Sequence, residues 1–377
     1  MTVRIITGDC LTVLPQLAAE GVRAHAVVCD PPYHLTSIVK RFGAAGAALA
    51  KVGATGAYAR ASAGFMGQQW DGGDVAFRPE TWTAVMACMR PGAFLTAFAS
   101  TRGYHRMVCA IEDAGFIIHP MLAWVFATGF PKATRFNQPE LEGWRYGLQA
   151  LKPAMEPICM AQVPMDGTGS NNWMRHGCGG LNIDACRVGG KKDWPTTRSY
   201  AAGKLAGTCG SGGFDVQETA SDGKGRWPAN VIHDGSAEVE AAFAAFGERT
   251  SGKPCGIKAG GRGNAFGHYN GGIPVTGIGD TGSASRFFFS AKADAADRAG
   301  SFHPTVKPTD LMRWIVQLTC PPGGLVLDPF AGTGSTGLAA DQLGMDAILI
   351  EKDPTYAADA RRKISADAGL FSTLVAE

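Results

Sequence analysis

The feature that most constrains the fold is a short apolar run that ends at Asp30-Pro31-Pro32-Tyr33. Residues 26–29 are apolar or nearly so, which is typical of the end of a buried parallel strand. The strand cannot continue past the acid, because proline lacks a backbone donor and fixes φ. We therefore expect a carboxylate and unpaired carbonyls at the carboxyl end of a strand, where ligands bind in open α/β sheets.

This turn suits the recognition of an exocyclic amine on a nucleobase. Such an amine is a poor nucleophile, because its lone pair is delocalised into the ring. If Asp30 and the Pro31 carbonyl accept its two hydrogens, the nitrogen moves towards sp³ geometry and the lone pair is freed. Tyr33 offers a ring on which a flipped base can stack. The alternative is that the turn, Pro32 included, only ends a strand, as proline-rich tetrapeptides often do.

The surrounding sequence alternates between strand and helix patterns. Strands are predicted at 3–6, 24–29, 93–99, 116–126 and 156–162, and helices at 11–17, 79–89 and 101–114. This order is typical of a doubly wound α/β sheet. Residues 34–78 are rich in Gly and Ala without clear periodicity, and such a long loop directly after the Asp30 turn is predicted to be a mobile lid over substrate.

A second motif lies near the carboxyl end, after a predicted helix and a buried strand at 325–327. Gly332, Gly334 and Gly337 fit G-x-G-x-x-G between a strand and a helix, and Glu351 follows nearly 20 residues later. This is formally the dinucleotide fingerprint, in which the acid binds ribose hydroxyls. NAD is therefore one candidate ligand, but no second mononucleotide-binding half follows Glu351 in this sequence.

S-adenosylmethionine accounts for the same residues better than NAD does. Its ribose also needs an acid, and its carboxylate can bind the helix N-terminus after Gly334, at Ser335. Asp328 is a candidate partner for the ammonium group, Phe330 for the adenosine, and Lys307 for the methionine carboxylate. The predicted cofactor site comprises Asp9, Cys10, Asp30, Lys307, Asp328, Phe330, Gly332, Gly334, Ser335 and Glu351.

The middle of the chain, residues 164–300, is irregular and rich in Gly, Asn, Arg, Lys and Trp. Such a mixture suits phosphate contacts and the readout of base edges, although an irregular surface with solvated charges is the alternative. The candidate DNA contacts are basic residues in this region and in the loop before it: Lys132, Arg175, Arg187, Lys191, Lys192, Arg198 and Arg226.

Composition excludes some classes of protein and leaves others open. The formal net charge of +2 decides nothing about nucleic acid, because a basic face can hide in a balanced total. None of the ten cysteines forms a Cys-x-x-Cys pair, so we expect reduced thiols and no metal site. No apolar run approaches the length of a membrane span, and no signal-peptide pattern is present, so a cytoplasmic protein is expected.

These motifs together resemble the β class of amino-methylating DNA methyltransferases, over about residues 1–165 and 285–365. In that class the Asp-Pro-Pro-Tyr turn comes first, the recognition region second, and the Phe-x-Gly-x-Gly loop, here 330–334, last. Residues 8–11, with Asp9 and Cys10, are similar to an N-terminal cofactor motif in which the acid reaches the adenine. Residues 303–308, with Lys307, are similar to the motif before the glycine loop.

The resemblance implies a Rossmann-like, circularly permuted methyltransferase fold with an irregular recognition insertion. Three parts are expected: a catalytic half at 1–163, a target-recognition region at 164–300 and a cofactor half at 301–377. The strands at 3–6 and before Glu351 should then be neighbours.

The resemblance also implies the reaction: methylation of the N6 amine of a flipped adenine in double-stranded DNA. An acid in the first position of the turn usually accompanies adenine, and N4-cytosine is the alternative. RNA or protein acceptors fit the long insertion less well, and a silent DNA-binding regulator is a further alternative. Residues 129–132, 180–184 and 225–230 look like stretches of phage and stand-alone enzymes without a partner nuclease, which suggests a phage-encoded or bacterial nucleoid-associated protein. Dimerisation is common in the class.

Overall fold

A computed structural model describes residues 1–33, 74–189, 199–200, 216–217, 226–250, 257–258, 273–274, 281–292, 297, 306–367 and 373–376. The chain divides into two compact units. The first contains Met1–Asn182, Asn230–Ser236 and Ser290–Glu377, and the second contains Ile183–Ala229 and Ala237–Phe289. Most of the loop predicted to be a lid lies outside the described residues. Its last part forms the 3₁₀ turn η1 (Val75–Phe77).

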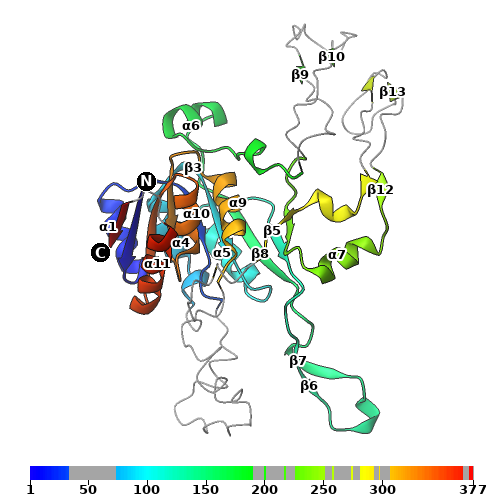
Figure 1. Ribbon diagram of the computed structural model, residues 1–377. Helices are drawn as coiled ribbons and strands as arrows, with labels where there is room; N and C mark the ends of the chain where they lie inside the picture. The colour runs from blue at the N-terminus through cyan, green and yellow to red at the C-terminus, as the bar shows by residue number, and fades with distance from the viewer. Residues whose placement is uncertain are drawn as a thin grey trace, which may run out of the picture. The chain divides into compact units, whose positions relative to one another are not determined.

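The first unit is built on one large mixed sheet (Figure 1). Its parallel strands stand in the order β3 (Met89–Phe98), β2 (Ala24–Cys29), β17 (Leu325–Asp328), β18 (Asp346–Glu351), β1 (Thr2–Thr7) and β19 (Thr373–Ala376). On the other side of β3 follow β8 (Met155–Gln162), β5 (Leu122–Val125) and β11 (Val231–His233), and β4 (Ile117–Ile118) also pairs with β8. The strand β8 runs antiparallel to β3.

The sheet confirms the predicted Rossmann-like α/β class. It also confirms that the first strand and the strand before Glu351 are neighbours, since β1 and β18 pair in parallel with Val3 opposite Ala347. The two ends of the chain therefore meet in one sheet, as the permuted order requires (Figure 1).

Two layers of helices enclose the sheet. The helices α1 (Cys10–Ala19), α4 (Pro79–Ala87) and α5 (Tyr104–Asp113) share one core with Val27 and Cys29 of β2. The intervening residue Val28 is also fully buried and points to the opposite face, because side chains alternate along a strand. The helices α9 (Thr309–Thr319), α10 (Ser335–Gln342) and α11 (Pro354–Asp367) form the other layer, drawn in orange and red in Figure 1.

Two predicted elements differ from those observed, for local reasons. The strand predicted at 116–126 is split into β4 and β5, because Pro120 cannot donate to a ladder. The helix predicted from residue 101 begins only at Tyr104, since the Ser100 hydroxyl and carbonyl both accept from the Gly103 amide.

Short elements make up the rest of the described chain. The first unit also holds β6 (Lys132–Arg135), η2 (Pro139–Leu141), β7 (Arg145–Gln149) and α6 (Gly169–His176). The second holds η3 (Asp184–Cys186), β9 (Ser199–Tyr200), β10 (Val216–Gln217), α7 (Ala237–Ala244), β12 (Arg249–Thr250), β13 (Ile257–Lys258), β14 (Ile273–Pro274), β15 (Thr281–Gly282) and η4 (Ala284–Phe287). The strand β16 (Phe289–Ser290) returns the chain to the first unit.

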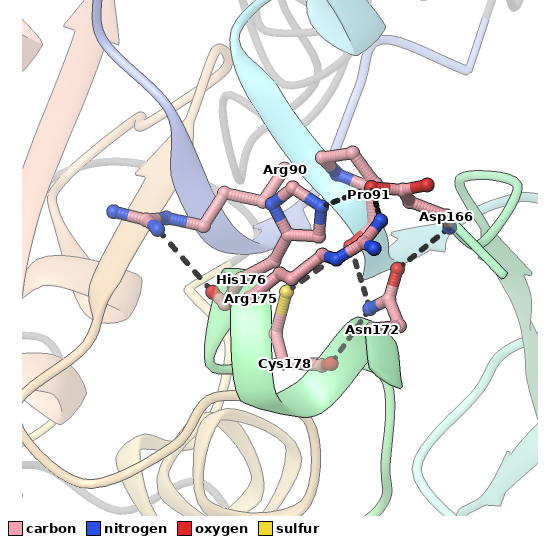
Figure 2. Close-up of polar contacts among 7 residues, drawn as sticks. All are labelled: Arg90, Pro91, Asp166, Asn172, Arg175, His176 and Cys178. Atoms are coloured by element: carbon pink, nitrogen blue, oxygen red, sulfur yellow. Dashed lines mark hydrogen bonds and ion pairs between the residues drawn. The ribbon is translucent and has the colours of Figure 1, made fainter. Parts of the chain in front are cut away.

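The α6 segment is held at the amino end of β3 by one buried amide, Asn172 (Figure 2). Its Nδ2 donates to the carbonyls of Pro91 (3.0 Å) and Cys178 (2.9 Å), and its Oδ1 accepts from the Asp166 amide (2.8 Å). Gly92, at φ +78°, packs so closely that a Cβ there would lie 2.3 Å from this Nδ2. The amide therefore joins α6 to the sheet.

We expect Asn172→Ala to lower the free energy of unfolding by about 2–4 kcal/mol, because two carbonyls and one amide of the backbone lose their partner and the amide side chain itself is fully buried. Urea unfolding measures this. Arg175→Ala is the control, since its ion pair with Asp166 is exposed and worth less than about 1 kcal/mol. Equal losses in the two variants would contradict the role given to Asn172.

Candidate active site

The Asp30 turn and the glycine loop meet at one cavity of about 820 Å³ in the first unit. They do so because β2, β17 and β18 are parallel neighbours, so that their carboxyl ends share one edge of the sheet. Most of the predicted cofactor residues line the cavity: Asp9, Cys10, Asp30, Lys307, Asp328, Phe330, Gly332, Ser335 and Glu351. Gly334 is absent from the wall and has a packing role instead.

The glycine loop is tied to the end of β18 by Glu351. One carboxylate oxygen accepts from the Gly332 amide (2.7 Å) and the other from the Asp353 amide (2.7 Å). Burial raises the pKa of this carboxyl above its usual value. An ionised carboxylate has about four acceptor positions, so Glu351 keeps capacity for a ligand hydroxyl.

The loop then begins α10 with Gly334 in the left-handed region, at φ +78°. The first amides of a helix have no partner within the helix and attract an anion. Ser335 stands at this end, and its Oγ accepts from the buried Lys363 ammonium (3.2 Å). Because the lysine can only donate, the hydrogen of the Ser335 hydroxyl is free to point to another acceptor.

Asp328 is the last residue of β17 and lies between the two motifs. Its side chain is buried, and its oxygens accept from the Phe330 amide (2.9 Å) and the Thr336 hydroxyl (2.6 Å). Burial raises its pKa to about 7, against the lowering effect of these hydrogen bonds. The group therefore titrates near neutrality.

This raised pKa predicts how stability depends on pH. The folded state binds the Asp328 proton more tightly than the unfolded state does. Protonation of Asp328 therefore stabilises the fold fully below about pH 4, and this stabilisation is lost as the pH rises towards 7. Asp328→Asn should therefore gain stability relative to the natural chain between pH 4 and 8, by about 4 kcal/mol. Thermal unfolding across this range tests it, and a difference that does not change with pH would contradict it.

The N-terminal motif closes another side of the cavity. Asp9 caps α1, since its Oδ1 accepts from the Leu11 amide (3.0 Å), and its Oδ2 lies 2.8 Å from the Lys352 ammonium. The hydrogen bond from Lys352 lowers the pKa of Asp9. Cys10 is buried, and burial raises its pKa to about 12, so the thiol stays protonated.

The Asp30 turn carries a compact polar cluster. The Lys307 ammonium lies 2.6 Å from Asp30 Oδ2 and 3.1 Å from Glu156 Oε2. The Tyr33 hydroxyl donates to Asp30 Oδ1 (2.8 Å) and lies 3.3 Å from the same Glu156 oxygen. Lysine and tyrosine thus each contact both carboxylates.

The cluster is shielded from water mainly on the lysine side. The side chain of Lys307 is only 6% exposed, and its ammonium stands 4.9 Å from the centre of the buried Phe98 ring. Burial lowers the pKa of this ammonium, but Asp30 and Glu156 outweigh that effect and raise it to about 12. Lys307 is therefore charged at any physiological pH and faces the Asp30 turn.

The candidate DNA contacts are dispersed over the chain. Lys132 is on β6, and Arg175 is on α6, at the opposite end of β3 from the Asp30 turn. In the second unit, Arg187 lies over the Trp227 ring (5.4 Å) and Arg226 over the Phe287 ring (4.9 Å). The other three, Lys191, Lys192 and Arg198, lie outside the described residues, and a role in DNA binding stays a prediction for all seven.

Several cavity or cluster residues were not predicted from the sequence. Glu156 is the most informative, because it stands at the start of β8 and reaches the Asp30 turn only through antiparallel pairing with β3. Arg78, Lys352, Asp353 and Tyr356 also line the cavity. Lys352 and Asp353 directly follow the strand end at Glu351, which is the signal that would have indicated them.

Two classes of site were also sought in the described part of the chain. There, no group of three or more His, Cys, Asp or Glu side chains is placed to hold a metal ion. The described helices include none with the length and apolar character that a membrane span needs.

One segment of this site is similar to a known family of sequences. A family model described as DNA methylase, for N6 and N4 methyltransferases, matches residues 269–362, which include Lys307, the glycine loop and Glu351. The predicted resemblance to DNA methyltransferases is thereby confirmed at the level of this family for this segment. The class β and the identity of the base stay predictions.

Individual relatives match over short stretches. The Type II methyltransferase M2.DpnII of Streptococcus pneumoniae is 38% identical over 65 residues, 17% of this chain and 24% of its own. M.HinfI of Haemophilus influenzae is 39% identical over 62 residues, 16% of this chain and 17% of its own. The alignments thus span a quarter or less of these curated relatives.

Among solved structures, a putative DNA modification methylase of Thermus thermophilus, complexed with S-adenosyl-L-methionine, is similar with a TM-score of 0.45 and 15% identity. The match covers 99% of this chain and 98% of that one.

Proposed function

We propose that this chain is a DNA methyltransferase that transfers a methyl group from S-adenosylmethionine to the N6 amine of a flipped adenine in duplex DNA. One observation carries the proposal. The Asp30 carboxylate lines the same cavity as the glycine loop and Glu351. A hydrogen-bond acceptor for the target amine thus lies next to residues suited to bind a nucleoside. The match of residues 269–362 to the DNA methylase family supports it.

The cavity suits S-adenosylmethionine in size and in the chemistry of its walls. About 820 Å³ lies within the usual range for small-molecule sites. Glu351 would accept from the ribose hydroxyls, Phe330 would pack against the adenosine, and Ser335 with the α10 N-terminus would bind the carboxylate. When bound, the cofactor supplies an electrophilic methyl group on a sulfonium.

The residues of the Asp30 turn would prepare the acceptor. Asp30 and the Pro31 carbonyl would each accept one hydrogen of the amine, and the Tyr33 ring would hold the flipped base. The nitrogen lone pair would form the new N–C bond, and the cofactor would leave with the electron pair of its S–C bond on sulfur. One amine proton then passes to Asp30 and from there to water. Positioning and electrostatic orientation provide most of the acceleration.

Cytosine N4 is the main alternative acceptor, because it needs the same two hydrogen-bond acceptors. A DNA-binding regulator that has the same fold but no catalytic activity is the second alternative. Double-stranded DNA is the proposed partner in every case, with six candidate contacts in the recognition region and Lys132 on β6 before it.

Mass spectrometry of nucleosides tests these alternatives. Duplex DNA of varied sequence is incubated with the full chain and S-adenosylmethionine, digested and analysed. N6-methyladenine is the expected product. N4-methylcytosine would overturn the base assignment and keep the reaction. The absence of any methylated base, with DNA binding retained, would favour the regulator.

A further inference from the structure

We infer that Glu156 is a positioning residue for the methyl transfer: it takes over Lys307 and the Tyr33 hydroxyl when Asp30 accepts the target amine. This inference rests on the proposed function. It concerns a residue outside the Asp30 turn and outside the glycine loop.

The first step is a competition for Asp30. One of its oxygens contacts the Lys307 ammonium at 2.6 Å, and the other accepts from the Tyr33 hydroxyl at 2.8 Å. An incoming amine that donates to this carboxylate must share or displace these donors. An ionised carboxylate has about four acceptor positions, so Asp30 has room for the amine, but sharing weakens its bonds to both donors, and a second acceptor beside them stabilises them.

Glu156 is already within reach of both donors. Its Oε2 lies 3.1 Å from the Lys307 nitrogen and 3.3 Å from the Tyr33 oxygen. The first distance is already that of an ordinary hydrogen bond, and a shift of a few tenths of an ångström brings the second to one. No change of backbone is needed for this exchange.

Lys307 cannot leave the cluster for solvent. Its side chain is 6% exposed, and its ammonium is held over the fully buried ring of Phe98. A buried charge without a partner is strongly unfavourable, so the lysine needs a carboxylate in every state of the reaction. Glu156 meets this need while Asp30 is engaged with the amine.

The net charge of the cluster of Lys307, Asp30 and Glu156 also supports a positioning role for Glu156. One ammonium and two carboxylates give the cluster a net charge of −1 when all three are ionised. Positive charge develops on the amine nitrogen during methyl transfer, and a preorganised negative charge stabilises it. Without Glu156 the lysine would neutralise Asp30, and the cluster would have no net charge to offer.

Three variants test this in the full chain: Glu156→Gln, Lys307→Met and the double variant. Glu156→Gln should lower kcat about 10–100-fold, with KM for cofactor and DNA changed less than about threefold. The double variant restores a net charge of −1 on Asp30, so its kcat should exceed that of Glu156→Gln at least tenfold. The matched control is Glu112→Gln, on an exposed position of α5.

The outcomes separate this inference from the proposed function. An unchanged kcat in Glu156→Gln, or a double variant slower than both single variants, would overturn the inference. A natural chain that makes no methylated base would overturn the proposed function instead.

A stability cycle tests the lysine contact without any activity. If Glu156 can hold Lys307 alone, Asp30→Asn lowers Tm only slightly, whereas Asp30→Asn with Glu156→Gln lowers it by far more than the sum of the single changes. Additive effects would overturn the inference even if the chain methylates DNA.

Discussion

Asp30→Ala is expected to lower kcat for methyl transfer by about 10³-fold or more, because the amine loses the acceptor that frees its lone pair. The change also removes one of the two carboxylates that contact Lys307. The rate is measured as methyl incorporation into duplex DNA, at saturating cofactor and DNA, so that weaker binding does not contribute.

Asp310→Ala is the matched control for this change. Asp310 is an exposed carboxylate at the start of α9 that pairs with the nearby Arg313. We expect a rate close to that of the natural chain. If Asp30→Ala kept more than a tenth of that rate, Asp30 would have no place in the mechanism.

Gly334→Ala is expected to lower the free energy of unfolding by about 3 kcal/mol and to weaken cofactor binding more than tenfold. The residue has φ +78°, and an added Cβ would lie 2.8 Å from the Cβ of Ala360. The loop must therefore shift, and the first turn of α10 shifts with it. Urea unfolding and calorimetric titration with S-adenosylmethionine measure the two effects.

Gly323→Ala separates backbone strain from steric conflict. Gly323 has nearly the same dihedral, φ +69°, but nothing lies within 4 Å of a Cβ added there. We expect a loss of about 1 kcal/mol and unchanged cofactor binding. Two variants of equal stability would show that packing against α11 does not matter at Gly334.

The parts of the site that could be predicted from the sequence are those imposed by neighbouring residues. Two prolines after Asp30 end a strand wherever it lies. Glycines at 332 and 334 permit positive φ, and both residues adopt it. Asp9 precedes an apolar helix and caps it, as short acidic residues do.

The meeting of these motifs was also predictable, from a general property of parallel sheets. Strands that each end in a motif place those motifs at one edge when they are parallel neighbours. The pairing of β17 with both β2 and β18 satisfies this condition. The glycine loop and the Asp30 turn thus share one cavity, although about 300 residues separate them in the chain.

What the sequence by itself determined is therefore the local chemistry: the acidic turn, the glycine loop and the alternation that makes an α/β sheet. Only the tertiary structure decided which side chains contact one another in the site. Glu156 reaches Asp30 because β8 runs antiparallel to β3, and Lys307 reaches it across 277 positions of the chain. Asn172, by contrast, is a polar residue of the predicted recognition region that the fold buries as a structural amide. The physical reason is that strand direction and burial depend on the whole core, and no local pattern encodes them.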